Sequence, residues 1–223
     1  MTGIGRGGEW SYPQLPPAER IADAAVQGLG LVLALAGAVT LIVLAARGAG
    51  AGLVAAVSVY GGVLVTGFAV SAFYHHTPWE RLRPVLRRLD HAAIYLVIAA
   101  TCTPVAALAG GWFAWAVLAL IWALALAGAV RKLAFWRAPA RGDSLLYLGL
   151  GWLPALLLWP IVQVFAPLVT GLILAGGLFM STGVTVFNRE GLRFATAIWH
   201  GFVLAGSGCF FAAISLGLVT LPA

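Results

Sequence analysis

The chain has 223 residues, of which 62% are hydrophobic and only 9% are charged, and its formal net charge is +6. An ordinary soluble domain has about 25% charged residues, so this composition excludes a soluble globular protein and a disordered chain. Apolar windows of roughly 20 residues, long enough to cross a bilayer core of ~30 Å, recur through the sequence. We therefore predict an all-α integral membrane protein. In such a protein the placement of Lys and Arg matters more than their total, and we expect no nucleic-acid partner.

Hydropathy predicts seven transmembrane spans, at about 28–46, 51–75, 90–109, 111–130, 144–163, 166–186 and 194–219. The segment ERIADAAVQ at 19–27 precedes them, and it forms either a short interfacial helix or the N-terminal start of the first span. Only Gln163, Ala166 and Pro167 mark the division between the fifth and sixth spans. Pro104, Pro154 and Pro160 predict kinks inside spans. The chain divides into a cytoplasmic tail, 1–20, and a seven-helix transmembrane domain, 21–223.

The basic residues are distributed very unevenly over the predicted loops. Twelve of the 13 fall on the side that holds the N-terminal tail and the loops after the second, fourth and sixth spans: Arg6, Arg20, Arg81, Arg83, Arg87, Arg88, Arg131, Lys132, Arg137, Arg141, Arg189 and Arg193. Only Arg47 falls on the other side. Because cytoplasmic loops carry an excess of Lys and Arg, we expect a cytoplasmic N-terminus and an extracytoplasmic C-terminus in the inner (plasma) membrane.

Polar residues gather at one end of the predicted bundle. Ser71 and His75 end the second span, Asp90 begins the third, and Thr196 and His200 begin the seventh. The predicted topology puts all of them in the cytoplasmic half. Residues four apart share one helix face, so Ser71 lies beside His75 and Thr196 beside His200.

Two histidines and a carboxylate from three helices are typical of a catalytic zinc site with an open position for water. We therefore take His75, His200 and Asp90 as candidate metal ligands, and Asp90 and Ser71 as candidate catalytic residues. Asp90 is either the third ligand or the base that holds a nucleophilic water. Ser71 orients a ligand or stabilises an oxyanion.

Each candidate also has a purely structural interpretation. His75 can be an interfacial histidine beside His76, and Asp90 can cap its helix as an N-terminal acid. His200 can be a buried, hydrogen-bonded histidine without metal, although ionisable groups at this depth are rare and usually functional. We expect His76 and His91 at the surface or behind the ligands.

Three segments resemble a known family: SAFYH (71–75), RRLDHAAIYLVIAATCTP (87–104) and AIWHGFVLAGSGCFF (197–211). They are similar to the hemolysin III proteins of bacteria, which belong with the progestin and adipoQ receptors in a superfamily that also includes alkaline ceramidases. The resemblance implies seven helices, a cytoplasmic N-terminus and a zinc site near the cytoplasmic surface. Its histidines are one at the end of helix 2 and two in an H-x-x-x-H on helix 7. His75 matches the first, His200 matches the second of the pair, and Ser71 and Asp90 match a nearby serine and aspartate.

The chain departs from that pattern at three positions. Thr196 stands where the first helix-7 histidine is expected, and Gln27 and Phe210 stand where bacterial relatives often have histidine. The three-histidine site cannot form, because threonine is a poor zinc ligand. Either Asp90 replaces the missing ligand, or metal affinity is reduced or lost.

The resemblance implies a zinc-dependent hydrolase of lipid amide or ester bonds, with a membrane lipid as substrate or ligand. Two alternatives stay open at this point: a pore-forming or lytic membrane protein, and a lipid-responsive receptor without catalysis. The sequence does not indicate the oligomeric state.

Overall fold

A computed structural model describes residues 15–135, 141–189 and 191–221, with the backbone alone for 141–145. Residues 1–14 of the expected tail, which include Arg6, lie outside the described residues, as does Arg137. Within the described part, seven helical segments are long and apolar enough to cross a membrane. The predicted seven-helix architecture is confirmed. Helices are expected here because a lone apolar segment in lipid must satisfy its backbone hydrogen bonds internally.

Six of the spans are built on single helices: α1 (Pro17–Ala46), α2 (Gly50–His76), α3 (Arg83–Ala109), α4 (Gly111–Phe135), α7 (Pro167–Phe187) and α8 (Ala195–Val219). A short 3₁₀ turn, η1 (Glu80–Leu82), leads into α3. The fifth span is composite, made of α5 (Arg141–Trp152), η2 (Leu153–Leu157) and α6 (Leu158–Val164). Pro154 lies in the 3₁₀ segment η2, as expected for a residue that interrupts α-helical hydrogen bonding.

The first helix begins at Pro17 rather than near residue 28, and it runs for 30 residues. The segment 19–27 is therefore the N-terminal start of the first span, not a separate interfacial helix. Proline is well placed at the first position of a helix, because that amide would have no intrahelical acceptor. The early start brings the polar side chains of this segment into the helix bundle.

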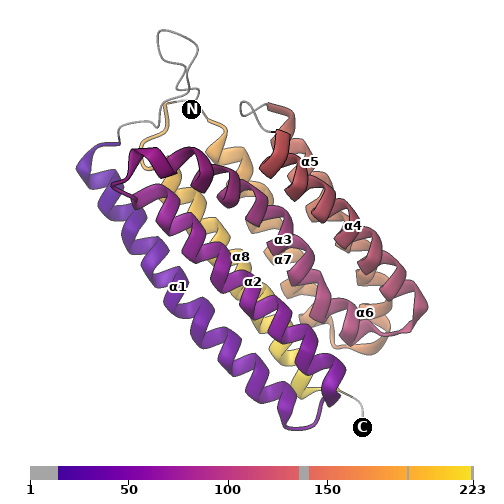
Figure 1. Cartoon of the computed structure of the whole chain (residues 1–223). Coiled ribbons are helices and arrows are strands. Elements are labelled where there is room, and N and C mark those ends of the chain that lie inside the picture. The colour runs from indigo at the N-terminus through magenta and orange to yellow at the C-terminus, as the bar shows by residue number, and fades with distance from the viewer. Residues whose placement is uncertain (1–14, 136–140, 190, 222–223) are drawn as a thin grey trace.

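The helices form a ring in which neighbours in sequence are mostly neighbours in space (Figure 1). α1 packs between α2 and α8, α3 packs between α2 and α4, and α7 packs on α8. The composite fifth span closes the ring, with contacts to α3, α4 and α7. The start of α1 and the end of α8 lie at opposite ends of the bundle (Figure 1). Which end faces the cytoplasm stays a prediction.

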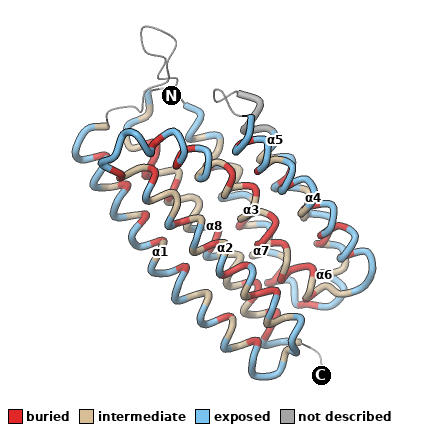
Figure 2. The backbone as a smooth tube through the Cα atoms, in the orientation of Figure 1, coloured by how far each residue is buried: buried red, intermediate tan, exposed pale blue. Residues whose placement is uncertain are grey.

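Buried residues follow the inward faces of the helices, and the outward faces are exposed and apolar, as lipid contact requires (Figure 2). Small residues let the helices approach closely. α1 and α2 approach closely at Gly61, where a Cβ atom would lie 2.6 Å from the Cβ of Ala38.

That contact predicts the effect of a one-carbon change. We expect Gly61→Ala to lower the free energy of unfolding by about 1–3 kcal/mol, because the added methyl group must push α1 and α2 apart. Gly62→Ala is the matched control, because a Cβ at the next residue would meet nothing within 4 Å. Thermal and denaturant unfolding in detergent would measure both. Equal stability of the two variants would contradict the packing described here.

Candidate active site

The starts of α1, α3 and α8 and the end of α2 lie at the same end of the bundle (Figure 1). Each span reverses direction relative to the last, so residues far apart in sequence come together there. The predicted candidates Ser71 and His75 lie on the last turns of α2, Asp90 lies near the start of α3, and His200 lies in the second turn of α8.

The first helix contributes a row of buried polar side chains, and the sequence analysis did not assign them to the site. Glu19, Asp23 and Gln27 are spaced four residues apart on α1, and all three are buried, Asp23 and Gln27 almost completely. The spacing places them on one face of the helix. The signal was present in the sequence as polar residues at every fourth position of ERIADAAVQ. Hydropathy discards it, because acidic and amide side chains lower the mean of any window that includes them.

Asp23 binds the histidine of α8. The Oδ1 atom of Asp23 lies 2.6 Å from Nδ1 of His200, and both side chains are at least 95% buried. A carboxylate can only accept hydrogen bonds, so Nδ1 of His200 carries the proton and donates it. His200 is thereby held as the tautomer whose Nε2 atom has a free lone pair.

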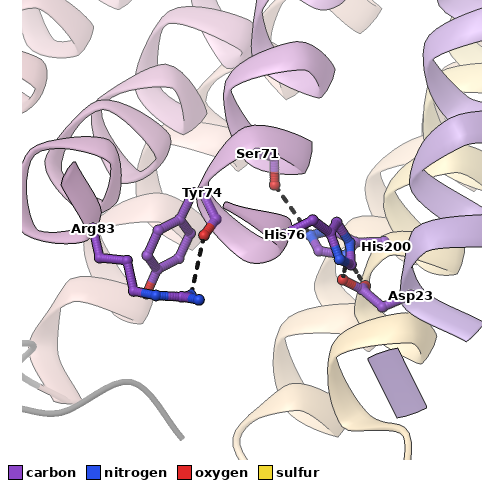
Figure 3. Close-up of polar contacts among 6 residues, drawn as sticks. All are labelled: Asp23, Ser71, Tyr74, His76, Arg83 and His200. Carbon is purple, nitrogen blue, oxygen red and sulfur yellow. Dashed lines mark hydrogen bonds and ion pairs between the residues drawn. The ribbon is translucent and has the colours of Figure 1, made fainter. Parts of the chain in front are cut away.

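The other ring nitrogen of His200 contacts α2 (Figure 3). Its Nε2 atom lies 3.3 Å from the hydroxyl oxygen of Ser71. Because Nε2 is the acceptor in this tautomer, the Ser71 hydroxyl donates. One imidazole thus joins a carboxylate of α1 to a hydroxyl of α2.

Two adjacent histidines of α2 complete the cluster. His76 is partly exposed, and its Nε2 atom lies 3.1 Å from Oδ2 of Asp23, so Asp23 contacts two histidines at once. The ring of His75 lies 5.0 Å from that of His200, nearly perpendicular to it. The structure therefore brings His75, His200 and Ser71 together, as the sequence predicted. It places His76 against the carboxylate as well, in the expected position behind the candidate ligands.

Asp90 of α3 contacts a different histidine, His91. Its carboxylate interacts electrostatically with His75, and its Oδ2 atom lies 3.6 Å from Nδ1 of His91, which also donates to the carbonyl of Arg87. The Asp90 side chain is 14% exposed. It belongs to the same polar end of the bundle as the histidines.

An elongated apolar cavity of about 210 Å³ begins at this polar cluster. Ser71, Asp90 and His200 line it at one end, and Cys102, Val105 and Phe210 line it farther along the bundle. Its walls come from α2, α3, α7, α8 and the composite fifth span. Phe210, which stands where histidine was expected, adds an apolar ring to the wall. The cavity thus has a polar end that contains three of the four predicted site residues and an apolar body.

The zinc prediction concerns His75, His200 and Asp90. Within the residues that the structure describes, no group of three or more His, Cys, Asp or Glu side chains is placed where it could hold a metal ion. Thr196, one turn before His200, is buried and brings no metal-binding nitrogen. The donor chemistry suits zinc, but the side chains as placed do not form a coordination shell. Metal binding therefore stays a prediction.

Comparisons with known proteins now identify the family. The family model described as "Haemolysin-III related" matches residues 25–211. The chain belongs to the haemolysin-III-related family. It is 36% identical to "Hemolysin-3" of Bacillus cereus over 194 residues, and this matched region covers 86% of this chain and 89% of that protein. It is also 30% identical over 207 residues to "Hemolysin-3 homolog" of Bacillus subtilis (strain 168), which covers 92% of this chain and 96% of that protein. The resemblance seen in the sequence is confirmed, and the chain is a multi-pass haemolysin-III-like membrane protein.

The contact between Asp23 and His200 predicts a large effect on stability. We expect Asp23→Asn to lower the free energy of unfolding by about 1–2 kcal/mol, because the buried hydrogen bond from Nδ1 of His200 then goes to a neutral amide oxygen and not to a charged carboxylate. Glu19→Gln is the matched control, one turn earlier on the same face of α1. Denaturant unfolding in detergent would measure both variants. A larger loss for Glu19→Gln than for Asp23→Asn would contradict the assigned role of Asp23.

Proposed function

We propose that this haemolysin-III-like protein is a membrane-embedded hydrolase that cleaves an ester or amide bond of a lipid. The observation that supports the proposal is the cavity, whose polar end holds Ser71, His200 and Asp90 and whose body is lined by apolar side chains. An acyl chain matches the apolar body. A carbonyl group at the head of that chain would then lie beside the polar cluster, which holds a base and hydrogen-bonding groups.

The residues themselves would perform three tasks. The apolar walls bind the acyl chain and exclude water from it. The fixed tautomer of His200 directs one basic nitrogen, Nε2, toward Ser71 on the cavity wall. Asp90 provides a second acidic or basic group at the same end, suited to proton transfer.

A bulky side chain in the cavity should weaken binding of the lipid substrate. Ala93 lines the cavity on α3, one turn after Asp90. We expect Ala93→Phe to raise the KM for a long-chain lipid ester or amide by at least ~10-fold, because the ring occupies space that the acyl chain needs. Val59→Phe, on the exposed face of α2, is the control and should leave KM unchanged. A lipid that binds in the cavity without being hydrolysed would favour the receptor alternative instead.

Zinc is a separate proposal within this function. His75, His200 and Asp90 would hold the ion, and zinc when bound would supply Lewis-acid polarisation of a carbonyl group. One contact supports this proposal. Histidines that bind metals usually donate their other ring N–H to a carboxylate or carbonyl group, and Nδ1 of His200 donates to Asp23 in this way, which leaves Nε2 available as a ligand. Since three donors are not in place among the described residues, His75 and Asp90 would have to turn toward His200.

Metal analysis of the detergent-purified chain tests this proposal. The zinc proposal requires about one zinc ion per wild-type chain, as in a mononuclear catalytic site. Asp90→Ala should empty the site, and Thr196→His should raise its occupancy by adding an imidazole one turn from His200. Purified protein that stays free of zinc, with unchanged stability in His75→Ala, would exclude the zinc proposal and leave the hydrolase proposal open.

A further inference from the structure

Three side chains at the end of the cavity have the connectivity of a serine-hydrolase triad. The Asp23 carboxylate accepts a hydrogen bond from Nδ1 of His200 at 2.6 Å, and Nε2 of the same ring lies 3.3 Å from the Ser71 hydroxyl (Figure 3). In such triads the carboxylate fixes the imidazole, the imidazole takes the serine proton, and the serine attacks a carbonyl carbon. The constellation is recognised by geometry and roles, because it recurs on unrelated folds in different chain orders.

The surroundings of each group fit its role. Asp23 and His200 are buried, so their hydrogen bond is shielded from water. Ser71 lines the cavity, where a lipid carbonyl can reach its hydroxyl. The 3.3 Å separation is at the long end of hydrogen bonding, as is common for catalytic pairs in the absence of substrate. The Nε2 atom of His76 lies 3.1 Å from the second oxygen of Asp23, where a protonated His76 forms an ion pair with the carboxylate.

We propose that Ser71 is the nucleophile of a metal-independent acyl transfer, with His200 as general base and Asp23 as the residue that positions His200. This inference rests on the proposed hydrolase function and identifies how its nucleophile is activated. The substrate class is an ester or amide of a long-chain acid.

The reaction balances without an external oxidant, reductant or metal. Ser71 Oγ bonds to the acyl carbon as its proton passes to Nε2 of His200. The tetrahedral intermediate then expels the alcohol or amine, which takes that proton, and an acyl ester remains on Ser71. Water attacks this ester and gives a proton to His200, which returns it to Ser71 as the fatty acid leaves.

Zinc binding and serine activation compete for the same atom. Nε2 of His200 has one lone pair, which can accept the Ser71 proton or bind a metal ion, but not both. The two proposals therefore differ in their response to chelation. An activity that survives removal of metal is expected for the triad and excluded for the zinc site.

The test is covalent labelling of the full-length chain in lipid nanodiscs. The probe is an alkyl fluorophosphonate, applied after exhaustive treatment with a chelator, and mass spectrometry locates the adduct. We expect a stoichiometric adduct on Ser71. Ser71→Ala should abolish labelling, whereas Ser58→Ala should label as the wild type does, because the Ser58 hydroxyl on the same helix donates to the carbonyl of Val54 at 2.7 Å.

Asp23→Asn separates positioning from mere stability. It should slow labelling by at least ~100-fold while the probe concentration for half-maximal rate stays unchanged, and Asp23→Glu should restore part of the rate. A thermal unfolding measurement on each variant is the control that it is folded at the labelling temperature. The wild-type adduct is decisive by itself, so the test does not depend on any variant.

Four results are separable. An adduct on Ser71 in chelated protein, with lipid hydrolysis that also resists chelation, supports both the triad and the hydrolase proposal. An adduct on Ser71 without turnover of any lipid ester or amide supports the triad and overturns the lipid hydrolase. Hydrolysis that needs zinc, without an adduct on Ser71, overturns the triad and leaves the hydrolase in place. Absence of both adduct and hydrolysis overturns both.

Discussion

The hydrogen bond between Asp23 and His200 is the constraint on which the polar end of this bundle depends. A carboxylate inside a membrane bundle is costly unless it is paired, and Asp23 is paired with His200 of α8 and His76 of α2. The first, second and last helices are therefore tied together at one point. The same bond selects the tautomer of His200 and sets the direction of its second nitrogen. The hydrogen bond between Asp23 and His200 thus both joins α1 to α8 and orients the candidate base.

The cavity depends on the composite fifth span. The fifth span is not one continuous α-helix. Pro154 instead lies in the 3₁₀ segment between α5 and α6, and the residues around it, Gly151 to Ala155, include several that line the cavity. Farther along the span Leu157 and Ile161 are buried, whereas Trp159 is largely exposed. The broken fifth span thus forms part of the wall of the apolar cavity whose polar end holds Ser71, Asp90 and His200.

Much of this arrangement could be predicted from sequence, because its causes are local. Span length and charge distribution predict seven helices, and alternating direction brings His75 and His200 to the same end. The order of helices around the ring is a different matter, since it depends on packing between distant faces. For that reason Asp23 was missed: its value lies in a contact across 177 residues of sequence. Asp90 lies at the same polar end as His200, but no sequence pattern shows that its carboxylate lies 3.6 Å from Nδ1 of His91.

Thr196 bears on whether Nε2 of His200 binds a metal ion or accepts the Ser71 proton. A third imidazole one turn before His200 would let three strong nitrogen ligands share a zinc ion, and the lone pair of Nε2 would be committed to the metal. Threonine removes that nitrogen and leaves a buried hydroxyl in its place. If zinc binds more weakly for that reason, Nε2 would stay free for longer, while the contacts with Asp23 and Ser71 come from α1 and α2 and do not involve Thr196. On the proposals made above, threonine at position 196 would favour the use of His200 as a base for Ser71 over its use as a zinc ligand.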